Sequence, residues 1–290
     1  MLLLSQILNG IQIGSIYALV ALGYSLVYGI VKLINFAHGE IIMVGSYLTF
    51  YMVSRSGLSP FIAVPLTIFL CAALGMGIEK LAYKPLRNAA RISLLITAIG
   101  ISLLLQNLVQ LIMTPDPRMF RNLFPGQINL GQLNVSRVTI VTIIVSVIVM
   151  ILLSILINKT RIGKAMRATS EDNEAAKLMG ININNTISFT FAIGSGLAAI
   201  AAVLYSSSYL EISPTMGSML GLKAFVAAVL GGIGSIPGAV IGGFLIGIVE
   251  TFTKAYISST LADAIVFGIL ILVLLVKPTG IMGKNINEKV

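Results

Sequence analysis

Charged residues and cysteines are scarce in this chain of 290 residues. Charged residues make up 10% of the sequence and hydrophobic residues 57%, whereas a soluble domain carries about a quarter charged residues. Long apolar runs of this kind are typical of transmembrane helices, and the length suits one compact bundle. The single cysteine, Cys71, excludes an intrachain disulfide and a cysteine-based metal site. We therefore expect an all-α polytopic membrane protein with a single transmembrane domain over residues 1–290.

Motifs for metal, phosphate or nucleophilic chemistry are also missing. The one histidine, His38, cannot form a cluster of metal ligands by itself, and the sequence places no serine or cysteine nucleophile. The glycine-rich stretch 231–238 fails as a phosphate loop because Pro237 takes the last glycine position of a GxGxxG pattern. No Lys-Ser or Lys-Thr pair follows it. The sequence thus predicts no metal, no cofactor, no ATP binding by this chain and no enzymatic activity.

The net charge of +9 does not indicate a nucleic-acid partner. The basic residues lie between the apolar segments rather than on one face, which is the pattern of positive-inside topology. They gather in the connection 80–91, in the connection 159–186 and in the tail with Lys277, Lys284 and Lys289. We expect all three regions to face the cytoplasm. The connection 114–137, with three prolines, is expected outside as a turn-rich loop.

Nine apolar segments are predicted to lie in the bilayer, and counting back from an inner C-terminus puts the N-terminus outside. They are roughly 8–30, 41–53, 60–80, 92–113, 138–158, 187–207, 219–231, 238–254 and 261–277. The segment 41–53 is too short to cross, and the glycine-rich stretch 231–238 interrupts a second region. Non-helical backbone at membrane depth persists where protein or a watery cavity satisfies its polar groups. By analogy with transporters built from interrupted helices, we expect these two breaks to mark the translocation pathway. The expected pathway residues are Asn35, His38, Glu40, Gly234 and Ser235.

The connection 159–186 is the most charged loop and contains Glu174-Ala175-Ala176, three variable residues and then Gly180. Thr169 and Asp172 fit a capping box, and Gly180 fits the left-handed position after a helix, so we expect a short helix over roughly 171–179. Its apolar face would hold Ala175, Ala176, Leu178 and Met179. So short a helix is marginal in water and is either an ordinary solvated helix or one that docks into a partner's groove. The seven-residue spacing resembles the cytoplasmic coupling motif of ABC-importer permeases, which favours docking.

The chain as a whole resembles the LivH-type permeases of branched-chain amino acid ABC importers. The most specific match is Asn35-Phe36-Ala37-His38-Gly39-Glu40, and others are Gly14-Ser15-Ile16-Tyr17-Ala18-Leu19, Gly180-Ile181-Asn182 and Lys223-Ala224-Phe225. The resemblance implies an ABC-importer permease bundle in a bacterial inner membrane. It also implies a second, LivM-like permease, two ATPase subunits that bind the ATP, and an external substrate-binding protein. Residues expected to couple to the ATPase are Arg167, Glu174, Ala175, Ala176 and Gly180.

Several alternatives stay open at this point. Urea and short-chain amide permeases share much of the pattern, so the solute is leucine, isoleucine, valine, urea or an amide. A secondary transporter would carry ionisable residues deep in several segments, and the sequence offers few. An intramembrane enzyme would have to use His38 and Glu40, which are more simply explained as partners for the broken backbone. Lys223 and Glu250 are expected to snorkel to the interface or to pair with neighbours, and Glu79 beside Lys80 is expected at the interface.

Overall fold

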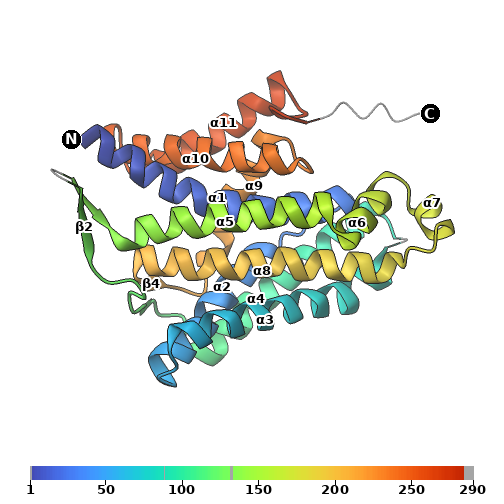
Figure 1. The fold of residues 1–290 in the computed structure, drawn as a ribbon, viewed down its shortest axis with the longest axis horizontal. Coiled ribbons are helices and arrows are strands. Elements are labelled where there is room, and N and C mark those ends of the chain that lie inside the picture. Colours follow the sequence, from blue (N-terminus) through green and yellow to red (C-terminus); the bar gives the residue numbers. More distant parts are fainter. Residues whose placement is uncertain (1, 88, 131–132, 284–290) are drawn as a thin grey trace.

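The computed structural model describes residues 2–87, 89–130 and 133–283, and it is predominantly helical (Figure 1). Lys284 and Lys289 of the basic tail lie outside the described residues. In this described part of the chain, six helices are long and apolar enough to cross a membrane. They are α1 (Leu2–Val31), α3 (Pro60–Ile78, extended by a π-helical turn Glu79–Tyr83 and a 3₁₀ turn Lys84–Leu86), α4 (Arg91–Met113), α5 (Arg137–Lys159), α8 (Ile183–Tyr209) and α10 (Ile236–Tyr256).

The other three predicted segments coincide with shorter helices. They are α2 (His38–Phe50, continued by a π-helical turn Tyr51–Arg55), α9 (Met216–Gly231) and α11 (Ala262–Val276). At 1.5 Å per residue these helices are about 20 to 24 Å long, which is less than the roughly 30 Å of a hydrocarbon core. The structure therefore shows a polytopic helical bundle with six membrane-capable helices, and nine crossings stay a prediction.

Small elements gather at the two ends of the bundle. At one end lie the N-terminus, a hairpin of β2 (Gln127–Leu130) and β3 (Leu133–Ser136), and an antiparallel pair of β1 (Arg118–Met119) and β4 (Glu211–Ile212). Figure 1 shows α6 (Arg161–Glu171) and α7 (Asn173–Leu178) at the opposite end. In the hairpin Gln127 faces Ser136 and Ile128 faces Val135. The connection 114–137, predicted as a turn-rich loop, thus includes short strands.

Helix α1 forms the centre of the bundle and packs closely on α10 through small residues. A Cβ atom on Gly243 would lie 2.5 Å from the Ala18 backbone, and one on Gly247 would lie 2.2 Å from the Gly14 nitrogen. Close backbone approach of this kind is what small residues provide in membrane helices. The stripe of Ala239, Gly243 and Gly247 therefore serves helix packing within the chain.

We expect Gly247→Ala to destabilise the protein, whereas Gly268→Ala should not. The added methyl at position 247 meets the backbone of α1, so the two helices must separate, at a cost of about 1–3 kcal/mol. Around Gly268 nothing lies within 4 Å of the new Cβ atom. The measurement is thermal unfolding of each purified variant in detergent. Equal unfolding temperatures for the two variants would show that the α1–α10 crossing is not tight.

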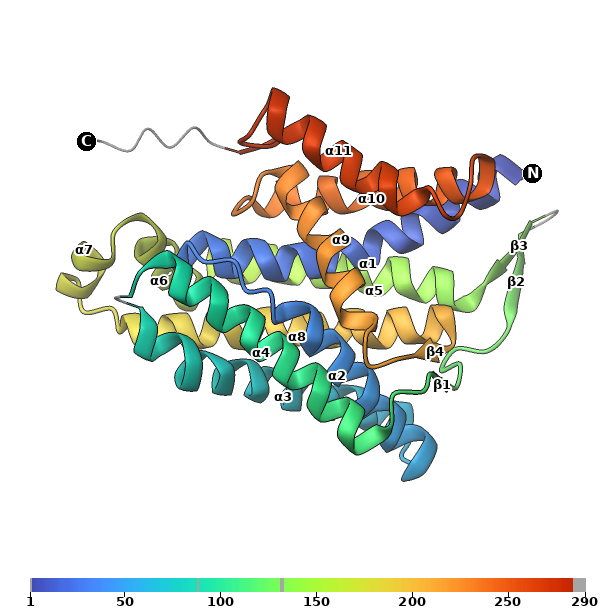
Figure 2. The same cartoon turned by 180° about the vertical axis from the view of Figure 1, so that it is seen from behind.

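Helix α2 begins inside the bundle rather than at its end. After α1 ends at Val31, the chain runs back along the bundle, and Figure 2 shows α2 starting part-way along it. Lys32 takes a left-handed backbone conformation with φ of 55°, which lets the chain reverse. The first turn of α2 therefore lies part-way along the bundle, among α1, α8 and α9.

Candidate functional site

The connection before α2 is held by the buried side chain of Asn35. Its Oδ1 accepts hydrogen bonds from the Ala37 backbone nitrogen at 3.1 Å and from the Tyr83 hydroxyl at 2.8 Å. The backbone nitrogen of His38 donates to the Asn35 carbonyl at 3.0 Å. Asn35 thus satisfies polar backbone in a region where water cannot, and it ties the break to α3.

The imidazole of His38 points toward α1, and it is 2% exposed. It packs edge-on against the Tyr24 ring, with ring centroids 4.7 Å apart. A Cβ atom on Gly23 would lie 2.4 Å from Nε2, so glycine is required there for the ring to fit. His38 therefore locks the start of α2 onto α1 by shape, and its Nε2 has no hydrogen-bond partner among the described residues.

We expect His38→Leu to impair transport more than Cys71→Ser does. The branched side chain of leucine does not match the flat space that the ring fills against Gly23 and Tyr24 of α1. Cys71 is buried in α3 and its thiol behaves as a small hydrophobic group. The measurement is solute uptake by cells that carry each variant at equal membrane abundance. Equal uptake for both variants would contradict the prediction that His38 belongs to the translocation pathway.

Glu40 lies two residues further on, between three helices. Its Oε1 accepts hydrogen bonds from Ser218 of α9 at 2.8 Å and from Ser102 of α4 at 3.2 Å. The second carboxylate oxygen, Oε2, is buried and has no hydrogen-bond partner among the described residues. Gly217 approaches so closely that a Cβ atom there would be 2.7 Å from Oε2. The side chains of His38 and Glu40 thus point to different helices, so the structure does not combine them into one acid–base site.

Gly234 and Ser235 lie in the connection between α9 and α10, next to the end of α1. Gly234 has a φ of 90°, and its Cβ position would lie 3.6 Å from the Gly29 Cα, near the end of α1. The Ser235 hydroxyl accepts from the Gly238 nitrogen at 3.2 Å and caps α10. In the described part of the chain no hydrogen bond or ion pair joins these residues to the Asn35–Glu40 segment. The two predicted parts of the pathway are therefore not joined by a polar contact among the described residues.

The charged loop folds as two helices rather than one. The sequence predicted a helix over 171–179 begun by Thr169, but Thr169 lies inside α6 and its hydroxyl donates to the Ala165 carbonyl at 2.8 Å. The N-cap of α7 is Asp172, whose Oδ1 accepts from the backbone nitrogens of Glu174 and Ala175 at 2.8 and 3.0 Å. Asp172 caps α7 because its backbone is extended, as a capping residue requires. Thr169 does not cap it, because the hydroxyl of a threonine inside a helix bonds back to a carbonyl of the preceding turn.

The end of α7 agrees with the sequence. Gly180 has a φ of 81°, which is left-handed. Its nitrogen donates to the Lys177 carbonyl at 3.0 Å, and the Ile181 nitrogen donates to the Ala176 carbonyl at 3.1 Å. These two bonds form a Schellman motif, so Gly180 ends the helix as predicted.

The exposed face of α7 differs from the expected one at Ala176. Leu178 and Met179 are 89% and 82% exposed, and Ala175 is also exposed, but Ala176 is 3% exposed and turns inward. The guanidinium of Arg167 donates to the Ile157 carbonyl at the end of α5. Arg167 therefore braces the corner between α5 and α6, while Glu174, Ala175, Leu178 and Met179 are free to meet a partner.

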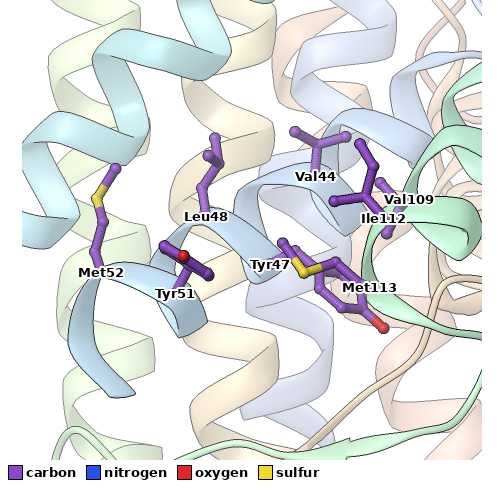
Figure 3. Close-up of a pocket in the computed structure, with 8 residues that line it drawn as sticks. All are labelled: Val44, Tyr47, Leu48, Tyr51, Met52, Val109, Ile112 and Met113. Atoms are coloured by element: carbon purple, nitrogen blue, oxygen red, sulfur yellow. The ribbon is translucent and has the colours of Figure 1, made fainter. Parts of the chain in front are cut away.

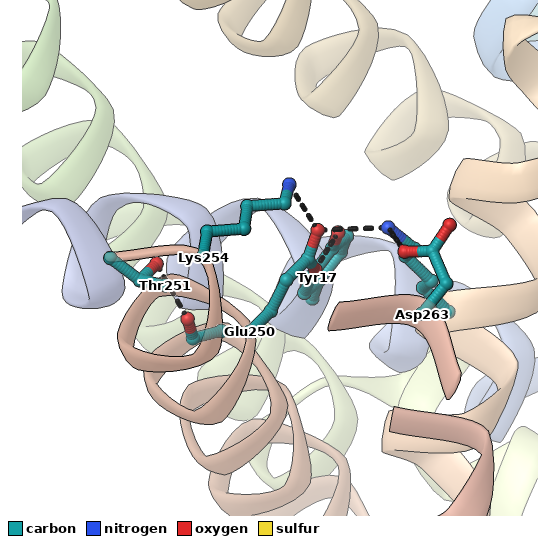
Figure 4. Close-up of polar contacts among 7 residues, drawn as sticks. Tyr17, Glu250, Thr251, Lys254 and Asp263 are labelled. Atoms are coloured by element: carbon teal, nitrogen blue, oxygen red, sulfur yellow. Dashed lines mark hydrogen bonds and ion pairs between the residues drawn. The ribbon is translucent and has the colours of Figure 1, made fainter. Parts of the chain in front are cut away.

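The bundle contains two buried ionic groups whose partners the sequence did not identify. Glu79, expected at the membrane interface, is fully buried, pairs with Arg87 and accepts from Ser188 at 2.5 Å. Its burial follows from the way the 3₁₀ turn after α3 brings Arg87 back over it. The second group joins α1, α9, α10 and α11 (Figure 4). Pairing, one of the two outcomes expected for Lys223 and Glu250, is what the structure shows.

This second group contains four charges and a tyrosine. Glu250 accepts from Lys223 at 2.8 Å, from Lys254 at 2.6 Å and from the Tyr17 hydroxyl at 2.5 Å. Lys223 also contacts Asp263 at 2.6 Å. The available signal was the i, i+4 spacing of Glu250 and Lys254 inside an apolar helix. No group of three or more histidine, cysteine or acidic residues that could hold a metal ion occurs among the described residues.

An apolar pocket of about 490 Å³ opens between α2 with its π-helical turn and α4 (Figure 3). It is lined by Val44, Tyr47, Leu48, Tyr51, Met52, Val109, Ile112 and Met113. No sequence pattern indicates this pocket, because helix α3 separates its two walls along the chain.

Comparison with known proteins identifies relatives over the full length. The chain is 44% identical to the high-affinity branched-chain amino acid transport system permease protein BraD of Pseudomonas aeruginosa, covering 99% of this chain and 98% of that one. It is 45% identical to the LivH permease protein of the same kind of system in Escherichia coli, covering 99% and 97%. A probable branched-chain amino acid transport permease protein LivH of Methanocaldococcus jannaschii is 32% identical over 96% of this chain and 92% of that one.

A solved structure has a related fold. A chain of PsaBC from Streptococcus pneumoniae, determined in complex with Fab, superposes with a TM-score of 0.52 at 15% identity, covering 93% of this chain and 91% of that one. The family described as branched-chain amino acid transport system / permease component matches residues 6–275. Its members are transport permeases rather than enzymes. With this match and relatives at 44–45% identity, the chain belongs to the permease components of branched-chain amino acid transport systems.

Proposed function

We propose that this protein is the transmembrane permease subunit of an ATP-driven importer that carries branched-chain amino acids into the cytoplasm. The observation that supports this proposal most is the sequence identity of 44% and 45%, over 99% of the chain, to permeases named for high-affinity branched-chain amino acid transport. The same names favour leucine, isoleucine and valine over urea or amides. The location that fits is a bacterial inner membrane, with several helices crossing it.

The proposed complex contains a second, LivM-like permease, two ATPase subunits and an external substrate-binding protein. The exposed Ala175, Leu178 and Met179 of α7 form the surface that would dock on an ATPase subunit. Helix α7 has six residues, so it is stable here through its cap and its contacts with α6 and α8, and it is suited to helix-in-groove docking. ATP would be bound by the partner subunits.

Reconstitution tests this function. The chain is purified with its co-encoded second permease and ATPases, placed in proteoliposomes and supplied with the binding protein and ATP. We expect uptake of leucine, isoleucine and valine that needs ATP, and no uptake by this chain alone. Uptake of urea but not leucine would move the assignment to the alternative solute. Uptake by the isolated chain without ATP would indicate a secondary transporter.

The orientation that fits this function places α7 inside and the N-terminus with the β2–β3 hairpin outside. Ser235 then lies toward the cytoplasmic side, because Gly234 packs near Gly29 at the α7 end of α1. We expect Ser235→Cys, in a Cys71→Ser background, to react with a membrane-impermeant thiol reagent in inverted vesicles but not in intact spheroplasts. Reaction in spheroplasts alone would reverse the orientation.

A further inference from the structure

Glu40 stands apart from the other buried acids of this chain. Three acidic side chains are buried among the described residues, namely Glu40, Glu79 and Glu250. Glu79 pairs with Arg87, and Glu250 pairs with Lys223 and Lys254. No lysine or arginine in the described part of the chain forms an ion pair with Glu40. A buried carboxylate without a cation is costly, and an ionisable residue at membrane depth indicates function.

The hydrogen bonds around Glu40 leave one carboxylate oxygen without a donor among the described residues. Ser102 and Ser218 donate to Oε1, whereas Oε2 has no partner among the described residues. A serine hydroxyl also carries two lone pairs that can accept. A primary ammonium group has three N–H donors, and Oε2 with the two serine oxygens offers three acceptors. These three acceptors therefore match an ammonium group in number as well as in charge.

The seam between α2 and α4 continues from Glu40 into the apolar pocket. Val44, which lines the pocket, follows Glu40 by one helical turn, about 6 Å along the axis. On α4, Ser102, Gln106 and Gln110 recur every four residues and are half-buried. One seam thus carries a carboxylate, polar side chains and a pocket of about 490 Å³ lined mainly by apolar side chains. A branched-chain amino acid has an ammonium group, which a carboxylate can bind, and an apolar side chain, which an apolar pocket can hold.

Helix α4 is the least buried of the six long apolar helices among the described residues. In its best membrane window 6% of the residues are buried, against 83% in α1. One of the polar contacts that hold α4 against the bundle is the hydrogen bond from Ser102 to Glu40. Movement of α4 would uncover Glu40 without opening the core around α1.

We propose that Glu40, with Ser102 and Ser218, binds the ammonium group of the transported amino acid, and that the seam between α2 and α4 is the path on which it does so. The inference rests on the proposed function. It adds a substrate-binding residue and assigns the neighbouring pocket to the amino acid's side chain.

The test uses the complete transporter in proteoliposomes with saturating loaded binding protein. We expect Glu40→Gln to lower the maximal uptake rate at least about tenfold, since it removes a charge-assisted hydrogen bond. Basal ATP hydrolysis should persist, and the unfolding temperature should be no lower than that of the wild type, because an uncompensated buried charge is removed. Glu40→Asp keeps the charge and should retain part of the uptake. Val109→Trp narrows the pocket and should also slow uptake.

The controls separate the possible failures. Glu211→Gln changes an exposed acid of β4 and should leave uptake at the wild-type rate. Wild-type uptake by Glu40→Gln would overturn the inference while leaving the proposed function intact, whereas no amino acid uptake by the wild-type complex would overturn the proposed function itself. If Glu40→Gln and Glu40→Asp lose uptake and unfolding temperature together, Glu40 fastens helices or pairs with a partner subunit and does not bind substrate. Unchanged uptake by Val109→Trp would assign the pocket to lipid.

Discussion

Gly180→Val should abolish ATP-coupled uptake, whereas Gly180→Asn should keep most of it. Position 180 has a φ of 81°, and no atom of the described residues lies within 4 Å of an added Cβ atom. The effect of valine is therefore backbone strain rather than a clash, about 1–3 kcal/mol, because a β-branched residue is a poor fit to left-handed space. Asparagine tolerates that conformation. Because α7 has six residues, strain of this size is enough to melt it.

The measurements are uptake and substrate-stimulated ATP hydrolysis by the reconstituted complex, with membrane abundance as the check on insertion. Ala175→Asp should give the same loss by a different route, since it puts a charge on the exposed face while the helix stays capped by Asp172. Normal coupling in Gly180→Val and Ala175→Asp would remove α7 from the contact with the ATPase. Equal loss in Gly180→Val and Gly180→Asn would show that glycine is needed there for the close approach of a partner.

Features fixed by the local backbone could be predicted from the sequence. The left-handed turn at Gly180 is of this kind, since glycine is the residue that adopts it at low cost. The break before α2 is another, because a short apolar run after a polar stretch cannot cross a bilayer alone. The start of α7 was placed wrongly because Thr169 and Asp172 are both capping residues, and their neighbours do not decide between them.

Features that depend on distant partners could not be predicted. Glu40 contacts Ser102 and Ser218, which are 62 and 178 positions away in the sequence. The sequence around Glu40 indicates neither contact. Glu79 looked interfacial beside Lys80, but Arg87 and Ser188 bury it. The inward turn of Ala176 likewise depends on the packing of α7 against α6 and α8. Helical periodicity on six residues does not separate an inner face from an outer one.

Glu250→Leu should give the largest loss of stability among single changes in the ionic group of Figure 4. Removing one partner of a buried ion pair costs about 3–5 kcal/mol, and we expect the lower end because Lys254 is 36% exposed. Lys223 keeps Asp263 as a partner, but the buried Tyr17 hydroxyl loses its acceptor. The unfolding temperature in detergent should fall clearly.

A double-mutant cycle shows where that loss comes from. Tyr17→Phe alone leaves Glu250 with two lysines and should cost about 1 kcal/mol, the value of one net hydrogen bond. In the Tyr17→Phe background Glu250→Leu should cost less than in the wild type, because no orphaned hydroxyl then remains in the core. Strict additivity would mean that the 2.5 Å contact between Tyr17 and Glu250 contributes nothing. A wild-type unfolding temperature for Glu250→Leu would mean that packing alone holds the helices α1, α9, α10 and α11 together. The close contacts of Gly243 and Gly247 with α1 would then be the main stabilising contacts.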